Sequence, residues 1–439
     1  MKLYSTNNPG QLVDFKTAVF NSMPADRGLY MPEHIPALEQ DFIENIQSKS
    51  LQEIAFTVAH ALIGADLPED ALRGIIDDTI NFDAPLRKID AHTQVLELFH
   101  GPSLAFKDFG ARFMSRVMSY FLQEGEPILD VLVATSGDTG GAVALGFLGV
   151  PNTRVTILYP KGKVSEIQEL QLCTNGQNIH ALEVDGTFDD CQRLVKEAFA
   201  DAELNARLRL TSANSINIAR LIPQTFYYFN AYAQLKRAGV EELVVAVPSG
   251  NFGNIAAGLL AQRMGLPIKQ FLAATNVNDT VPRYLESGRF DPQPSVQTLA
   301  NAMDVGAPSN WVRIMALFNE DFESVKQHIK AYSFNDEETL KAIKELWETH
   351  GYIACPHTAI AWLATQSYQQ ENPASTATSV FLSTAHPCKF PEALPAEISA
   401  QVIVPDVVNA LKNKQRKATA LTVNFPLFKE YLMNLPAGQ

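Results

Sequence analysis

The stretch His100-Gly-Pro-Ser-Leu-Ala-Phe-Lys-Asp-Phe-Gly110 is the basis of the fold prediction. It follows an apolar run, Val95–Phe99, and it leads into an amphipathic segment of helical length, Phe109–Gln123. Lys107 therefore stands where a strand passes into a helix, among aromatic and small residues. Desolvation by such neighbours lowers the pKa of a lysine, which a Schiff-base lysine requires. The alternative is a surface lysine at a helix start, and this stretch alone leaves the two about even.

The alternation of strand and helix continues along most of the chain. The predicted strands are Val95–Phe99, Val131–Thr135, Val155–Tyr159, Ile179–Val184, Leu243–Val247, Phe271–Thr275 and Ser379–Ser383. Between them lie helical segments, among them Phe109–Gln123, Phe188–Phe199, Ile222–Arg237 and Glu337–Thr349. Nearly continuous apolar strands separated by helices predict an α/β fold with parallel sheets flanked by helices. Ligands of such sheets bind beyond the carboxyl ends of the strands, so the loops there are the candidate sites.

The length of 439 residues predicts two or three domains. Residues 1–86 are expected to form a mostly helical N-terminal domain, because Asp41–Ile63 has helical spacing and Pro68 opens another helix. Residues 87–235 are expected to form a smaller α/β domain that carries Lys107. Residues 236–439 are expected to form a larger α/β domain.

Charge and composition exclude several classes of protein. The chain has 35 Lys and Arg against 48 Asp and Glu, a formal net charge of −13, which argues against general nucleic-acid binding. It has no signal-peptide pattern and no apolar run long enough for a transmembrane helix. No metal-binding motif is present, and scattered cysteines predict reduced thiols: Cys173, Cys191, Cys355 and Cys388. We therefore expect a cytoplasmic protein without a metal and without nucleic-acid or membrane partners.

Two further loops after predicted strands could bind anions. Thr135-Ser-Gly-Asp-Thr-Gly-Gly141 combines hydroxyls with the start of a helix, which suits a carboxylate or phosphate; the alternative is a tight turn with capping hydroxyls. Pro248-Ser-Gly-Asn-Phe-Gly-Asn254 has glycines that let the backbone approach a phosphate group. It matches no dinucleotide or P-loop motif, and a plain strand-to-helix turn has equal weight.

Two polar segments complete the candidates. Ser212-Ala-Asn-Ser-Ile-Asn-Ile-Ala-Arg220 offers an arginine with amide and hydroxyl donors, which suits a second phosphate, although helix capping with a structural arginine is slightly favoured on this segment alone. Ser383-Thr-Ala-His-Pro-Cys-Lys-Phe390 follows the last predicted strand. Thr384 offers a neutral hydroxyl there, and His386 and Lys389 are each expected to be structural.

Taken together, these loops resemble the threonine synthases, a family of pyridoxal-phosphate enzymes with the tryptophan-synthase-β-like fold (fold type II). The most specific pieces are Leu98–Gly110, Ala134–Gly140, Ser212–Asn217 and Val247–Asn254, in this order. The resemblance implies that fold, with an extended N-terminal helical segment.

The resemblance also implies roles for individual residues. Lys107 would be the catalytic residue and hold pyridoxal phosphate as a Schiff base, Thr384 would contact the pyridine nitrogen, and the cofactor phosphate would be held by Gly250, Asn251, Phe252, Gly253 and Asn254. Asp138 would face the cofactor hydroxyl, where many relatives have Asn, so that contact requires a proton on one partner. The substrate would be bound by Thr135, Ser136 and Thr139 at its carboxylate and by Asn214, Ser215 and Arg220 at its phosphate.

The implied reaction is the last step of threonine biosynthesis. O-phospho-L-homoserine and water would give L-threonine and phosphate by γ-elimination and β-hydration, in a monomer or homodimer. One alternative is a serine/threonine dehydratase or a cysteine-synthase-like lyase, which has no substrate phosphate to bind at Arg220. Another is a non-catalytic protein that binds phospho-ligands on the same scaffold, which would not need Lys107.

Overall fold

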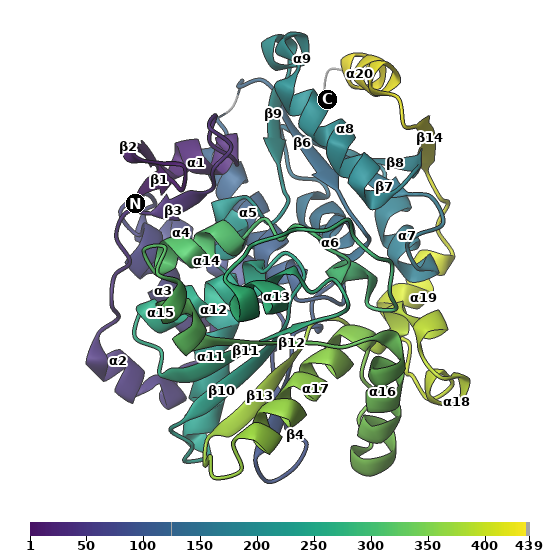
Figure 1. Cartoon of the computed structure of the whole chain (residues 1–439). Coiled ribbons are helices and arrows are strands. Elements are labelled where there is room, and N and C mark those ends of the chain that lie inside the picture. The colour runs from purple at the N-terminus through teal and green to yellow at the C-terminus, as the bar shows by residue number, and fades with distance from the viewer. Residues whose placement is uncertain (124, 436–439) are drawn as a thin grey trace.

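Two sheets of mainly parallel strands, covered by helices, make up most of the molecule (Figure 1). The computed structural model describes residues 1–123 and 125–435. The larger sheet has six strands in the order β12-β11-β10-β13-β5-β4, and only the pair β4 and β5 is antiparallel. Its strands are β12 (Ile329–Ser333), β11 (Ile268–Thr275), β10 (Leu243–Pro248), β13 (Thr378–Ser383), β5 (Thr93–Glu97) and β4 (Leu86–Lys88).

The second sheet has five parallel strands in the order β14-β8-β7-β6-β9. Its strands are β14 (Ala418–Thr422), β8 (Ile179–Asp185), β7 (Thr153–Pro160), β6 (Leu129–Ala134) and β9 (Arg209–Ser212). Every residue of β6 and β7 is buried, as expected for parallel strands covered on both faces. The parallel α/β prediction is confirmed, and all seven predicted strands are present.

The strands do not follow the predicted chain boundaries. β5, from segment 87–235, pairs with β13 in the larger sheet, and β14, from segment 236–439, pairs with β8 in the smaller one. Figure 1 shows the yellow C-terminal strand β14 beside the teal strand β8. Parallel neighbours need long crossover connections, so the chain can leave one sheet, build the other and return. The two sheets therefore do not coincide with the segments divided at residues 86 and 235, and the division into domains stays a prediction.

The first 32 residues hold a small antiparallel sheet that the sequence analysis missed, in the order β2-β1-β3. It comprises β1 (Lys2–Ser5), β2 (Asn8–Asp14) and β3 (Tyr30–Pro32), with α1 at Phe15–Asn21. Helices account for most of the regular structure from there to residue 86: α2 (Gln40–Glu44), the 3-10 helix η1 (Ile46–Ser48), α3 (Leu51–Ile63) and α4 (Glu69–Thr79). The helix expected over residues 41–63 is broken because Ser50 and Glu53 form a capping box that starts α3 anew.

The remaining helices connect and cover the sheets. They are α5 (Lys107–Phe121), α6 (Asp138–Phe147), α7 (Glu166–Cys173), α8 (Phe188–Ala200), α9 (Ala202–Arg207), α10 (Ile218–Leu221), α11 (Gln224–Arg237), α12 (Gly253–Arg263), α13 (Thr280–Ser287), η2 (Asn301–Met303), α14 (Trp311–Leu317), α15 (Phe322–His328), α16 (Asp336–His350), α17 (Pro356–Glu371), η3 (Pro387–Lys389), η4 (Pro391–Ala393), α18 (Ala396–Ser399), α19 (Asp406–Lys412) and α20 (Phe425–Met433). Within residues 1–123 and 125–435, no helix is both long and apolar enough to cross a membrane.

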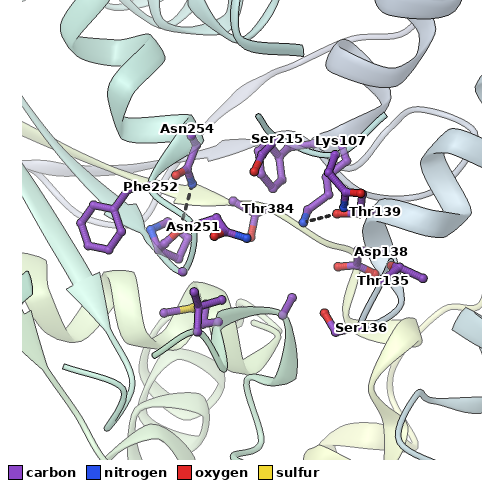
Figure 2. A pocket seen from close by; sticks show the side chains of 18 of the residues that line it. Lys107, Thr135, Ser136, Asp138, Thr139, Ser215, Asn251, Phe252, Asn254 and Thr384 are labelled. Carbon is purple, nitrogen blue, oxygen red and sulfur yellow. Dashed lines mark hydrogen bonds between the residues drawn. The ribbon is translucent and has the colours of Figure 1, made fainter. Parts of the chain in front are cut away.

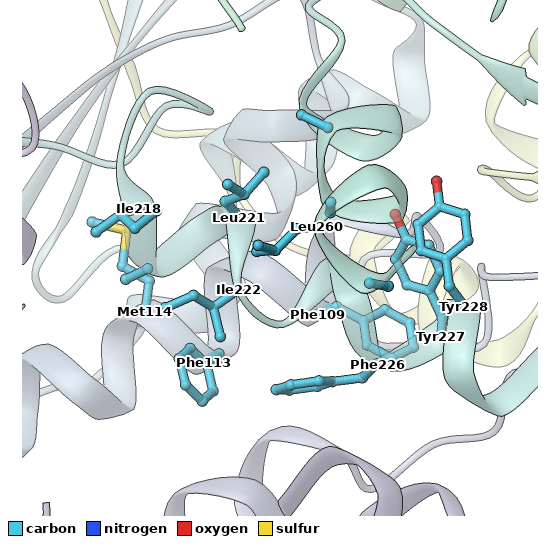
Figure 3. Packing of buried hydrophobic residues seen from close by; sticks show 14 of the residues in the cluster. Phe109, Phe113, Met114, Ile218, Leu221, Ile222, Phe226, Tyr227, Tyr228 and Leu260 are labelled. Atoms are coloured by element: carbon cyan, nitrogen blue, oxygen red, sulfur yellow. The ribbon is translucent and has the colours of Figure 1, made fainter. Parts of the chain in front are cut away.

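Helix α5, which begins at Lys107, is anchored in an aromatic core (Figure 3). The Phe109 ring meets the Tyr227 ring of α11 edge to face at 5.3 Å, and the Phe113 ring meets the Phe226 ring at 5.9 Å. All four side chains are fully buried. The position of the helix start is therefore fixed by packing rather than by the loop that precedes it.

We expect Phe113→Ala to destabilise the protein by about 3–5 kcal/mol, because a buried aromatic side chain is replaced by a cavity. The midpoint of unfolding in urea measures this. Tyr120→Ala on the same helix is the control, since Tyr120 is 43% exposed and should cost less than about 1 kcal/mol. Equal shifts for the two variants would contradict the proposed anchoring of α5.

Candidate active site

A cavity is lined by segments that follow strands of both sheets (Figure 2). All the site residues proposed from the sequence line it: Lys107, Thr135, Ser136, Asp138, Thr139, Asn214, Ser215, Arg220, Gly250, Asn251, Phe252, Gly253, Asn254 and Thr384. They come from segments up to 277 residues apart in the chain, between positions 107 and 384. The five loops selected from the sequence thus form one site, although the role of each residue stays a prediction.

The amine of Lys107 lies inside this cavity. Its Nζ donates a hydrogen bond to Oγ1 of Thr139 at 2.8 Å, drawn as a dashed line in Figure 2. Burial lowers the pKa of Lys107 to about 8; attraction by Asp138 opposes the shift, and the positive charges of Arg220 and Lys389 add to it. About a tenth of the amine is therefore uncharged at pH 7, far more than for an exposed lysine, and a nucleophile or a base requires the uncharged form.

Asp138 is held by partners from two other parts of the chain. The Nζ of Lys389 lies 2.7 Å from its Oδ1, and Nε2 of Gln168 donates to the same oxygen at 2.9 Å. Burial by itself raises the pKa of Asp138, but attraction by Lys389, His357 and Lys107 outweighs it and lowers the pKa to about 2. Asp138 is thus an anion at neutral pH, and a cofactor hydroxyl that faced it would have to supply the proton.

The turn before α12 forms a cradle of backbone groups. Phe252 has a φ of 60°, a conformation that few non-glycine residues adopt, and α12 begins directly after it. A Cβ on Gly250 would lie 2.9 Å from Cα of Met303, so only glycine fits there. The first amides of α12 have no acceptor within the helix and suit a phosphate. The Asn254 side chain instead braces the turn, because its Nδ2 donates to the carbonyl of Pro248 at 2.8 Å.

A second polar wall is made by Asn214, Ser215 and Arg220. The Arg220 guanidinium is 3% exposed and donates to the carbonyl oxygen of Ala213, while its Nε has no partner among the described residues. Burial lowers the pKa of Arg220 to about 10, with attraction by Asp108 opposing, so it stays charged at neutral pH. Nδ2 of Asn214 donates to the carbonyl of Ala134 at 2.8 Å, which ties this wall to β6. The wall offers positive charge to a second anion.

The loop after β6 uses its hydroxyls in two ways. Oγ1 of Thr135 accepts hydrogen bonds from the amides of Gly137 and Gly140, so this side chain caps the start of α6. Ser136 and Thr139 are partly exposed and face the cavity. The capping alternative from the sequence therefore fits Thr135, while Ser136 and Thr139 have the geometry of ligand contacts.

Two buried residues were not selected from the sequence. Lys389 was expected to be structural, and His357 was not considered. His357 lines the cavity, and its Nε2 accepts a hydrogen bond from the amide of Ala302 at 3.3 Å. Burial lowers the pKa of His357 to about 4, against attraction by Asp138, so it is neutral at pH 7. The sequence signal that could have pointed to Lys389 was its place in the stretch Thr384-Ala-His-Pro-Cys-Lys389, one of the candidate loops. No sequence pattern pointed to His357, which lies at the start of α17.

Pyridoxal phosphate fits these residues. A buried amine, a phosphate cradle at a helix N-terminus and the buried hydroxyl of Thr384 line one cavity. The backbone fixes two of these groups to each other, because the amide of Phe106 donates to the carbonyl of Thr384 at 2.9 Å. Within the described residues, no group of three or more His, Cys, Asp or Glu side chains is arranged to hold a metal ion.

Comparisons with known proteins agree with this geometry. Residues 86–384 match the family of pyridoxal-phosphate-dependent enzymes, residues 2–80 match the threonine synthase N terminus, and residues 358–431 match the threonine synthase C-terminal region. The chain is 44% identical over 437 residues to the threonine synthase of Serratia marcescens, with all of both chains covered.

Solved structures give the same result. The crystal structure of threonine synthase from Escherichia coli superposes with a TM-score of 0.92 at 41% identity, covering 99% of this chain and 100% of that one. The structure of PLP-bound threonine synthase from Brucella melitensis superposes with a TM-score of 0.90 at 35% identity, covering 98% of both chains. The chain belongs to the threonine synthase family of pyridoxal-phosphate-dependent enzymes.

Proposed function

We propose that this protein converts O-phospho-L-homoserine and water into L-threonine and phosphate. The observation that supports this substrate is the presence of two separate anion walls around one lysine: the turn 250–254 for the cofactor phosphate, and Asn214, Ser215 and Arg220 for the substrate phosphate. A pyridoxal-phosphate enzyme whose substrate carries no phosphate needs only the first of these.

In this reaction each residue of the cavity has a separate role beside the cofactor. Bound pyridoxal phosphate supplies an electron sink that stabilises negative charge on substrate carbons. Lys107 would hold the cofactor, and its amine, freed when the substrate amine takes its place, would move protons at Cα and Cβ of the substrate. Arg220 neutralises the phosphate as it leaves Cγ, and the hydroxyls of Ser136 and Thr139 orient the substrate carboxylate.

The alternatives are less well supported. A serine/threonine dehydratase, a cysteine-synthase-like lyase and a non-catalytic binding protein are not favoured, because the curated relatives that match over nearly the whole chain are threonine synthases. A cytoplasmic location and a monomeric or homodimeric state remain part of the proposal.

The decisive experiment incubates the pyridoxal-phosphate-loaded protein with O-phospho-L-homoserine and measures phosphate and amino acids. We expect equimolar phosphate and L-threonine, and neither product from Lys107→Ala. Phosphate with a 2-oxo acid in place of threonine would instead identify a deaminating, dehydratase-like enzyme. No turnover of any amino acid, with the cofactor bound, would favour the binding protein.

Arg220→Ala tests the substrate phosphate wall. The lost hydrogen bonds and charge should lower kcat/KM for O-phospho-L-homoserine roughly 10- to 100-fold, since a hydrogen bond to a charged group contributes about 1.5–3 kcal/mol. Initial-rate kinetics measure the change. Arg207→Ala is the matched control, because Arg207 lies at the surface in an ion pair with Glu203 and should leave the kinetics unchanged. Unaltered kinetics in Arg220→Ala would show that Arg220 does not bind the substrate phosphate.

The lowered pKa of Lys107 predicts the pH dependence of cofactor capture. Only the uncharged amine attacks an aldehyde, so the rate at which the cofactor-free protein captures pyridoxal phosphate should rise with pH around a midpoint of about 8. Stopped-flow absorbance measures the rate, with Lys107→Ala as the control that captures none. A midpoint above about 10, as for an exposed lysine, would contradict the burial of the amine.

A further inference from the structure

Behind the cavity lies a buried lysine that the proposed reaction does not use. Lys389 is fully buried in η3, which follows β13 of the larger sheet. Its Nζ lies 2.7 Å from Oδ1 of Asp138 and donates to the carbonyl of Ser103 at 2.9 Å. A fully buried ammonium is costly unless its partners compensate for lost water, so this arrangement is specific.

The Asp138–Lys389 pair connects three parts of the site. Asp138 is the first residue of α6, which follows β6 of the smaller sheet. Lys389 lies in η3, which follows β13 of the larger sheet. Ser103 lies in the loop before Lys107, and its carbonyl also accepts a hydrogen bond from Nε2 of Gln171. One ammonium thus holds the loop that precedes the catalytic lysine and the acidic residue that faces it.

The groups facing Asp138 are mostly basic. Lys389 from η3 and Lys107 from α5 attract its charge, and His357 from α17, neutral at pH 7, adds its attraction only when it is protonated. The thiol of Cys355, at the start of α17, is a neutral neighbour whose pKa is raised, first by burial. Among these, Lys389 lies in direct ionic contact and is fully removed from solvent, so it dominates the state of the carboxylate.

We propose that Lys389 is a positioning residue of this active site, which keeps Asp138 ionised and fixed beside Lys107. An ionised Asp138 stabilises positive charge on the Lys107 nitrogen, in a cavity where Arg220 and Lys389 disfavour it. The inference rests on the proposed role of this cavity as the cofactor site, but it is independent of the substrate.

The test compares Lys389→Met, Asp138→Asn and the double variant, without substrate. Absorbance of bound pyridoxal phosphate is recorded from about pH 5 to pH 9. In Lys389→Met the buried carboxylate loses its ionic partner, so its pKa rises and a new titration step should appear between about pH 5 and pH 8. The double variant has no carboxylate at position 138, and the new step should be lost. Lys429→Met, which removes a lysine paired with Asp201 and Glu203, should add no step.

A folded Lys389→Met without the new step would overturn the proposal, and so would a step that persists in the double variant. Thermal unfolding covers the case in which Lys389→Met does not fold. Recovery of folding in the double variant then supports charge pairing. If the double variant does not fold while Asp138→Asn does, the proposal is overturned, because the essential role of Lys389 would then be its hydrogen bond to the Ser103 carbonyl alone. Since no substrate is present, loss of O-phospho-L-homoserine turnover is a separate result.

Discussion

The burial of α5 is the constraint on which the chemistry of the site depends. Phe109 and Phe113 are fixed in an aromatic core, and the helix packs against α4, α6 and α10. The helix therefore cannot move toward solvent without losing several buried side chains. Its first residue, Lys107, is held with its amine in the cavity, where burial lowers its pKa. Packing energy from the core thus maintains an amine that would otherwise be fully charged.

Charge is distributed unevenly between the surface and this cavity. The chain has a net charge of −13, yet the charged residues that line the cavity in the described structure are Lys107, Arg220 and Asp138, with Lys389 directly behind. The local excess of positive charge suits a cofactor and a substrate that each carry a phosphate group. The net negative charge argues against polyanionic partners but has no bearing on small anions bound inside.

Residue patterns near one another in sequence were predictable, and tertiary partners were not. Apolar runs identified the seven central strands, whereas β14 was missed because four of its five residues are exposed. Loops after those strands identified the cavity lining, since parallel strands deliver their carboxyl ends to a common region. The sequence pattern could not distinguish side chains that contact a ligand from side chains that stabilise the loop itself. Thr135 caps α6, and the Asn254 side chain donates to the carbonyl of its own turn. Lys389 acts on the site through its ion pair with Asp138, which lies 251 positions earlier in the chain, so the sequence alone could not reveal this role.

The N-terminal segment is bound to the proposed phosphate wall by buried hydrogen bonds. The fully buried guanidinium of Arg313 in α14 donates to the carbonyls of Tyr30, Ser215 and Ile216. Nδ2 of Asn217 donates to the carbonyl of Val19 at 2.8 Å. Separating the first 32 residues from the rest would break the Arg313–Tyr30 and Asn217–Val19 hydrogen bonds, and each buried carbonyl left without a partner costs about 1–3 kcal/mol. The N-terminal segment is therefore an integral support of residues 214–220, the proposed phosphate wall, rather than an appendage.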